Sequence, residues 1–117
     1  MKRSILVVDD ERSITDTLVM ILTEAGFDAR GAYNGLDGAM QARDQCPNIL
    51  LSDVLMPKMD GIQLAIEVLK ACPETRVVLI SGQAATADYL ERARSRGYEF
   101  EFLPKPLEPE ELLAYLG

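Results

Sequence analysis

The sequence predicts an α/β fold in which a five-stranded parallel sheet is doubly wound, with helices on both faces. Strand-like and helix-like patterns alternate five times along 117 residues. The strand-like runs are rich in Val, Ile and Leu, which is typical of parallel strands that are buried on both sides. Short loops join the elements, and no linker, repeat or low-complexity stretch interrupts them. We therefore expect residues 1–117 to form one domain.

Each element has a local pattern that predicts it. Continuous apolar runs predict buried strands at 4–9, 49–53 and 76–81, and weaker patterns predict strands at 28–33 and 100–103. Apolar residues at helical spacing predict helices at 12–25, 36–45, 61–72 and 85–96, and a last helix that runs from Glu108-Pro109 to Leu116. Gly26 is placed to end the first helix, and Asp60 is placed to cap the third.

Composition excludes several classes of function. The chain has no histidine, which removes His-based acid–base catalysis, imidazole metal ligands and Ser-His-Asp or Cys-His machinery. A net charge of −7 argues against direct nucleic-acid binding by this domain, although a tethered DNA-binding domain stays open. No apolar run reaches the roughly 20 residues of a membrane span. Met1–Ser4 leads straight into a strand, without a secretory signal. We therefore expect a cytoplasmic protein without membrane contact.

The two cysteines, Cys46 and Cys72, each precede a proline at an expected helix end. A disulfide between them is conceivable, but the chain is not rich in cysteine and carries no secretory signal. We therefore expect both residues to be free thiols of an intracellular protein.

Charged residues follow three of the apolar strands. Asp9 and Asp10 follow the first, Asp53 ends the third and Lys105 comes just after the fifth. The carboxyl ends of parallel strands lie along one edge of an open sheet, where ligands bind. Carboxylates held together repel each other unless a cation is present. Mg²⁺ prefers oxygen ligands and few protein groups. The pattern predicts a Mg²⁺ site with one carboxylate left to react.

Four short motifs, each present once, follow one another along the chain. They are the acidic pair in Val7–Glu11, the segment Asp53–Gly61, the pair Ser81-Gly82 and the pair Lys105-Pro106. Together they resemble the motifs of the receiver domain of two-component response regulators, and the resemblance covers essentially the whole chain. It implies a flavodoxin-like fold with strand order 2-1-3-4-5. It also implies a cis peptide bond before Pro106.

The resemblance implies a role for each residue of the phosphoacceptor site. Asp53 would be the nucleophile that forms an acyl phosphate. Asp10, Asp53 and the backbone carbonyl of Leu55 would hold Mg²⁺ (or Mn²⁺), and Asp9 would act through a bound water. Lys105 would pair with the phosphoryl group as a point charge.

The resemblance also implies a conformational switch. Ser81 would donate its hydroxyl to the phosphoryl group, and Phe102 occupies the place of the family's switch aromatic. The change would reach the face formed by the fourth helix, the fifth strand and the fifth helix. A sensor histidine kinase or phosphotransfer protein is the implied partner. The downstream effector is unknown, and a homodimer through that face stays open.

Simpler readings exist for single residues. Asp9 and Asp10 could cap the first helix. In isolation, Ser81-Gly82 is an ordinary turn pair. Lys105 could be a surface lysine, and Phe102 could be a core aromatic. The four motifs together favour the functional reading of the acidic residues and of Lys105.

Two other classes of function were weighed. A Mg²⁺-dependent phosphohydrolase that forms an aspartyl phosphate would usually carry a second Asp two residues after the nucleophile, where this chain has Leu55. A phosphorylation-independent interaction module would keep only the fold, and the intact set of charged residues argues against it. The chain is thus expected to be a phosphoacceptor switch rather than an enzyme.

The chain departs from the family's usual pattern in a few places. Segment 97–105 is one residue longer than usual by our alignment, and Tyr98 and Arg94 stand where small and apolar residues are common. Leu55 and Gln83 occupy positions that affect how water reaches the acyl phosphate. Because Leu55 offers no polar group to position water, we expect the phosphorylated form to be moderately long-lived.

Overall fold

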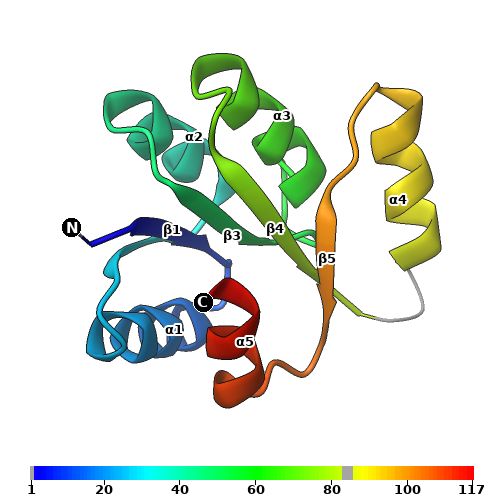
Figure 1. Cartoon of the computed structure of the whole chain (residues 1–117). Coiled ribbons are helices and arrows are strands. Elements are labelled where there is room, and N and C mark those ends of the chain that lie inside the picture. The colour runs from blue at the N-terminus through cyan, green and yellow to red at the C-terminus, as the bar shows by residue number, and fades with distance from the viewer. Residues whose placement is uncertain (1, 83–85) are drawn as a thin grey trace.

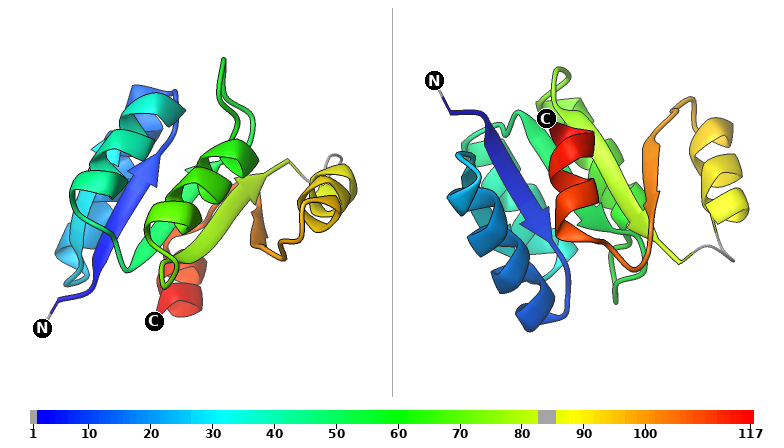
Figure 2. Two further views of the ribbon diagram at one scale, coloured as in Figure 1. Left: turned by 90° about the horizontal axis from the view of Figure 1, so that it is seen from above. Right: turned by 60° about the horizontal axis from the view of Figure 1, so that its bottom comes forward.

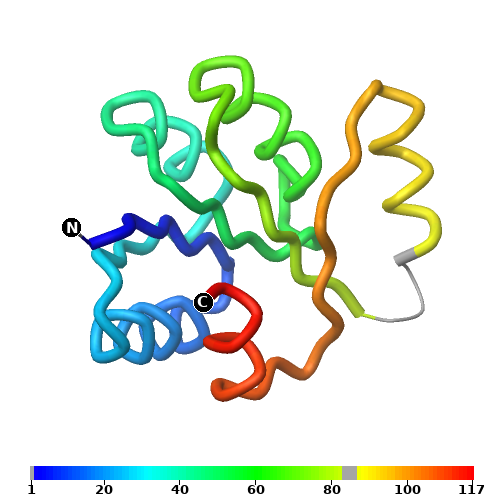
Figure 3. The backbone as a smooth tube through the Cα atoms, in the orientation of Figure 1, coloured from blue at the N-terminus to red at the C-terminus, as the bar shows by residue number. Residues whose placement is uncertain are grey.

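The structure is a computed structural model that describes residues 2–82 and 86–117. Its five strands are β1 (Ser4–Val8), β2 (Asp28–Ala32), β3 (Ile49–Asp53), β4 (Arg76–Ser81) and β5 (Glu101–Pro104). They form one parallel sheet in the order β2-β1-β3-β4-β5, which can be followed by colour in Figures 1 and 3. The expected fold class and strand order are confirmed.

Five helices cover the sheet in the described part of the chain. They are α1 (Arg12–Glu24), α2 (Gly35–Asp44), α3 (Gly61–Ala71), α4 (Thr86–Ser95) and α5 (Pro109–Leu116). Helices α1 and α5 lie on one face, and α2 and α3 lie on the other, with α4 beside β5 (Figures 1 and 2). Every predicted element is present. Within the described part of the chain, none of the helices combines the length and apolar character needed to cross a membrane.

The sheet separates two apolar cores. Successive side chains of a strand point to opposite faces of the sheet. Every residue of β3 is buried, so both faces are covered at this strand. Leu50 belongs to the core beneath α2 and α3. Leu51 belongs to the core beneath α1 and α5. This explains why the central strands are almost continuously apolar, because neither face of the sheet meets water.

Local signals set several element ends. Asp60 caps α3 by accepting the backbone N–H of Gln63 at 2.9 Å, and the Gln63 side chain accepts the N–H of Asp60 in return. This capping box fixes the start of the helix. Gly26 and Gly97 follow α1 and α4 with φ of 100° and 87°, in the left-handed region that favours glycine. Both predicted cap assignments for α1 and α3 are confirmed.

The unusual residue Tyr98 has a packing role. Its ring stacks on the buried ring of Phe100, with 5.6 Å between the centroids. Both rings pack against the core beneath α2 and α3. The lengthened segment before β5 is therefore held against the protein, while Arg94 is exposed.

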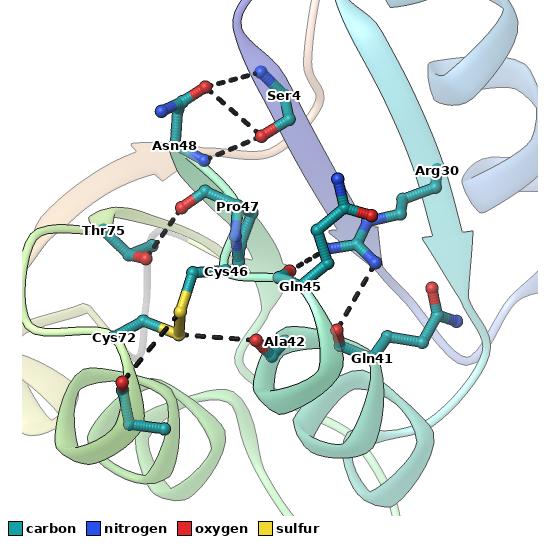
Figure 4. Close-up of a disulfide and its surroundings, with 11 residues drawn as sticks. Ser4, Arg30, Gln41, Ala42, Gln45, Cys46, Pro47, Asn48, Cys72 and Thr75 are labelled. Atoms are coloured by element: carbon teal, nitrogen blue, oxygen red, sulfur yellow. Dashed lines mark hydrogen bonds between the residues drawn. A yellow bond between two sulfur atoms is a disulfide. The ribbon is translucent and has the colours of Figure 1, made fainter.

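The expectation that both cysteines are free thiols is wrong. Cys46 and Cys72 form a disulfide with a Cα–Cα distance of 5.7 Å (Figure 4). Cys46 lies three residues before β3, and Cys72 lies four residues before β4. Because β3 and β4 are adjacent parallel strands, the two helix-to-strand turns lie side by side at one edge of the sheet. The sequence separation of 26 residues concealed this proximity.

Candidate functional site

Strand register brings the motif residues together at the carboxyl edge of the sheet. Val8 of β1 pairs with Ser52 of β3, so the residues that follow, Asp9 and Asp53, are neighbours. Ser81 pairs with Pro104. The backbone N–H of Lys105 then donates to the carbonyl oxygen of Ser81 at 3.0 Å. Parallel pairing thus gathers residues that are about a hundred positions apart.

The three aspartates form one carboxylate cluster. Asp9, Asp10 and Asp53 each present an oxygen, and these oxygens lie within 4.8 Å of one another. Asp9 is 2% exposed and Asp53 is 5% exposed, whereas Asp10 is open to solvent. Such a set is costly unless a cation or a proton offsets its charge.

The Asp9 carboxylate is buried and only partly hydrogen-bonded. Its Oδ1 accepts the backbone N–H of Glu11 at 2.9 Å, but its buried Oδ2 has no hydrogen-bond partner in the described part of the chain. Burial raises the pKa of the Asp9 carboxyl, and the negative charges of Asp53 and Asp10 add to this, against the Glu11 N–H and Lys105. An unpartnered buried oxygen in a set of hard oxygen donors fits a divalent cation such as Mg²⁺.

The helix-cap reading of the acidic pair does not hold. The N-cap residue of α1 is Glu11, whose side chain makes no capping hydrogen bond. Asp9 and Asp10 precede that position, and their carboxylates converge on Asp53 instead. The first acidic motif therefore shapes the cluster and does not cap the helix.

Lys105, which directly follows β5, completes the site. Its Nζ donates to Oδ2 of Asp53 at 3.0 Å, so it is not a free surface lysine. Burial alone would lower the pKa of Lys105, but the hydrogen bond to Asp53 and the charges of Asp53, Asp9 and Glu11 outweigh this and raise it. The Lys105-Pro106 peptide bond is cis, as expected from the resemblance.

A cleft of about 780 Å³ opens over these side chains. Its lining includes Asp10, Asp53, Ser81, Gly82 and Lys105, all of them singled out from the sequence, whereas Asp9 lines a neighbouring cleft. Ser81 is buried at the end of β4. Gly82 has open space around its Cα, so a Cβ there would meet nothing within 4 Å.

The cleft also contains residues to which no role was assigned from the sequence. Tyr89 reaches the cleft from α4, and Glu11 lies beside the acidic pair. Glu11 had a sequence signal, because it directly follows the two aspartates. Tyr89 had none, because only the placement of α4 beside β5 brings it to the cleft.

The loop between β3 and α3 forms the other wall of the cleft. Leu55 is 74% exposed there, whereas Met56 is buried and Met59 packs against the core. Leu55 thus presents an apolar side chain at the mouth of the cleft. Gln83 lies outside the described residues.

Gly61 lets this loop close on the strand. The backbone N–H of Gly61 donates to the carbonyl oxygen of Val54 at 2.8 Å. A Cβ on Gly61 would lie 2.9 Å from Val54 Cα and 3.0 Å from the carbonyl carbon of Asp53. Only glycine permits this approach, so Gly61 fixes the backbone that carries Asp53.

Phe102 and α4 lie on the side of the sheet that carries α2 and α3, as the core contacts of Phe102 and Tyr89 show. The Phe102 side chain is half-buried and packs against the core beneath α2 and α3. Arg92 of α4 pairs with Asp60 at 2.7 Å, which ties α4 to the start of α3. The position of Phe102 is thus compatible with either a core role or a switch role.

A second, more apolar cleft adjoins the site. It has a volume of about 590 Å³ and lies between α1 and the segment that follows β5. Asp9 and Lys105 line one end, and Ile14, Leu18 and Leu107 line its apolar part. A partner seated in this cleft would be next to the carboxylate cluster.

Curated relatives match nearly the whole chain in sequence. The chain is 31% identical over 114 residues to the DNA-binding response regulator MtrA of Mycobacterium tuberculosis, covering 97% of this chain and 49% of MtrA. It is 28% identical over 118 residues to the chemotaxis protein CheY of Thermotoga maritima, covering 100% of this chain and 97% of CheY. The chain thus spans about half the length of MtrA.

Solved structures of other proteins have the same fold as this chain. The receiver domain of NtrX from Brucella abortus matches with a TM-score of 0.82 and 32% identity, covering 96% of this chain and 93% of that one. The chemotaxis protein CheY4 of Vibrio cholerae matches with a TM-score of 0.88 and 25% identity, covering 99% and 97%. The family model of the response regulator receiver domain matches residues 5–117, and the chain therefore belongs to the response regulator receiver domain family.

Proposed function

We propose that residues 1–117 act as one receiver domain, a cytoplasmic phosphoacceptor switch that takes a phosphoryl group on Asp53 from a sensor histidine kinase. The observation that carries this proposal is the setting of Asp53. Its carboxylate is buried, holds Lys105 at 3.0 Å and shares one cluster with Asp9 and Asp10. The proposed nucleophile Asp53, the ammonium group of Lys105 and the carboxylates of Asp9 and Asp10 thus meet at the carboxyl edge of the sheet.

Each side chain of the site has a task in the transfer. Lys105 holds Oδ2 of Asp53, which leaves Oδ1 to attack the phosphorus atom of a phosphohistidine. The new O–P bond forms as the P–N bond breaks, and the electron pair returns to the imidazole of the donor. Lys105 then pairs with the phosphoryl oxygens as a compact positive charge.

A divalent cation belongs in the proposed site. Asp10, Asp53 and the backbone carbonyl of Leu55 would hold Mg²⁺ or Mn²⁺, and Asp9 would contact it through a water. When bound, the metal offsets the charge that develops on the transferring oxygens. The unpartnered Oδ2 of Asp9 supports a hard cation or its water shell at this point.

The switch would run from Ser81 to the face of α4, β5 and α5. A phosphoryl group adds a charge of about −1.5 to −2 beside Lys105 and Ser81. Ser81 donating its hydroxyl to that group would draw the start of α4 toward the cleft. Tyr89 lines the cleft, so it would respond to the same movement. Phe102 would rotate inward behind Ser81, and a single Phe102 rotamer in both states would refute that part.

The kinase and the effector would use different surfaces of the domain. The apolar cleft beside α1 ends at Asp9 and Lys105, so we place the phosphotransfer domain of the kinase there. MtrA is a DNA-binding response regulator of which this chain matches about half. An effector joined to this domain or a separate effector protein would read the α4-β5-α5 face.

Intact-mass spectrometry after incubation with acetyl phosphate tests the proposal. We expect one phosphoryl adduct that requires Mg²⁺ and is lost in Asp53→Asn. Asp37→Asn is the matched control, because Asp37 lies in the first turn of α2 and is not a member of the cluster, so the variant should keep the adduct. Absence of any adduct, together with failure to bind beryllofluoride, would favour a module that works without phosphorylation.

A further inference from the structure

We propose that Cys46–Cys72 is a reversible thiol–disulfide exchange site, at which a small dithiol reductant attacks Cys46. The bond joins the turns before β3 and β4, at the edge of the sheet opposite the carboxylate cluster. The inference goes beyond the proposed phosphoacceptor function and does not depend on it.

The two cysteines differ in exposure to solvent. Cys46 is exposed, whereas Cys72 is 3% exposed. A surface hollow of about 390 Å³ surrounds the bond, and Asn48, Ala71 and Glu74 contribute to its lining. A small thiol can therefore approach the bond from solvent, and it meets Cys46 first.

The surrounding backbone also offers a hydrogen-bond acceptor to each cysteine in its reduced form. Sγ of Cys72 lies 3.3 Å from the carbonyl oxygen of Ala42, a contact drawn in Figure 4. Sγ of Cys46 lies 3.9 Å from the carbonyl oxygen of Ala71. In the disulfide neither sulfur carries a hydrogen. After reduction each thiol would find an acceptor already in place, so the buried Cys72 thiol would not be left unpaired.

Other bonds hold the two turns together without the disulfide. Thr75 Oγ1 donates to the carbonyl oxygen of Pro47 at 2.8 Å. The backbone N–H of Arg76 donates to the carbonyl oxygen of Asn48 at 2.9 Å. The Asn48 side chain in turn accepts the backbone N–H of Ser4 at 2.8 Å (Figure 4). Reduction should therefore loosen the turns and leave the fold intact.

The exchange balances with a dithiol as reductant. Its thiolate attacks Sγ of Cys46, the S–S bond breaks, and the electron pair passes to Sγ of Cys72, which takes up a proton. The second thiolate of the reductant then attacks the mixed disulfide and releases Cys46 as a thiol. The dithiol leaves as a cyclic disulfide, so two electrons and two protons have moved to the protein.

The first experiment follows the oxidation state of the native chain. Dithiothreitol without denaturant should add 2 Da and make both residues available to iodoacetamide over time. The far-UV circular dichroism should stay unchanged, and removal of the reductant in air should restore the disulfide. Resistance to dithiothreitol until denaturant is added would overturn the proposal. Loss of the circular dichroism signal on reduction would overturn it as well.

Single variants test which sulfur reacts. The Cys46 thiol of Cys72→Ser should react with dithiobis(nitrobenzoate) at least tenfold faster than the Cys72 thiol of Cys46→Ser. Equal rates, or a faster Cys72, would overturn attack at Cys46. Both variants should still accept a phosphoryl group on Asp53 from acetyl phosphate. Failure of that reaction in every form would count against the proposed function and would leave the exchange site intact.

Discussion

Gly61→Ala should destabilise the domain because its new methyl group has no room beside β3. The Cβ would lie 2.9 Å from Val54 Cα and 3.0 Å from the carbonyl carbon of Asp53, and these are backbone atoms that cannot rotate away. Relief requires a shift at the start of α3 or at the end of β3. That shift would weaken the 2.8 Å hydrogen bond from Gly61 to Val54.

The size of the effect follows from these contacts. Overpacking costs about 1–3 kcal/mol, and one weakened hydrogen bond adds about 1 kcal/mol. The better helix propensity of alanine returns at most about 1 kcal/mol. A net loss of about 2 kcal/mol corresponds to a fall in Tm of roughly 8 °C for a chain of this size.

Urea unfolding followed by circular dichroism measures this loss. Gly82→Ala is the matched control, because a Cβ at Gly82 meets nothing within 4 Å and should leave the free energy of unfolding nearly unchanged. Gly61→Ala should also slow phosphoryl acceptance, because it displaces the backbone of Asp53. A Gly61→Ala protein as stable as Gly82→Ala would refute the steric argument.

Three further predictions concern charge and water. Asp9→Asn should raise Tm in EDTA, because burial raises the pKa of Asp9 and makes its negative charge costly to the folded state. This gain in Tm should shrink in excess Mg²⁺. The hydrogen bond from Arg76 lowers the pKa of Glu101, so this pair stabilises the fold above pH 4.5 and loses its effect as pH falls through the lowered pKa. Because both side chains are about a third exposed, Glu101→Gln should cost at most ~1 kcal/mol at neutral pH in urea unfolding, and should flatten the acid limb of stability. Leu55→Asn should speed loss of the phosphoryl adduct by mass spectrometry, and an unchanged rate would argue against the apolar mouth of the cleft as the cause of a long lifetime.

Local sequence was enough to predict most of the architecture. The apolar runs, the helical spacing, Asp60 and Gly26 act over a few residues, so each element could be placed within about two residues of its observed ends. The carboxylate cluster was also predictable, because parallel strands always align their carboxyl ends and the motif residues stand directly after apolar runs.

Tertiary structure decided what depends on neighbours that are distant in sequence. Cys46 and Cys72 meet only because β3 and β4 are adjacent, and neither cysteine carries a local sign of the other. Tyr89 reaches the cleft only through the placement of α4. The orphaned Oδ2 of Asp9 depends on the atoms that bury it. Sequence periodicity reports which face of an element is buried, and packing alone determines what that face touches.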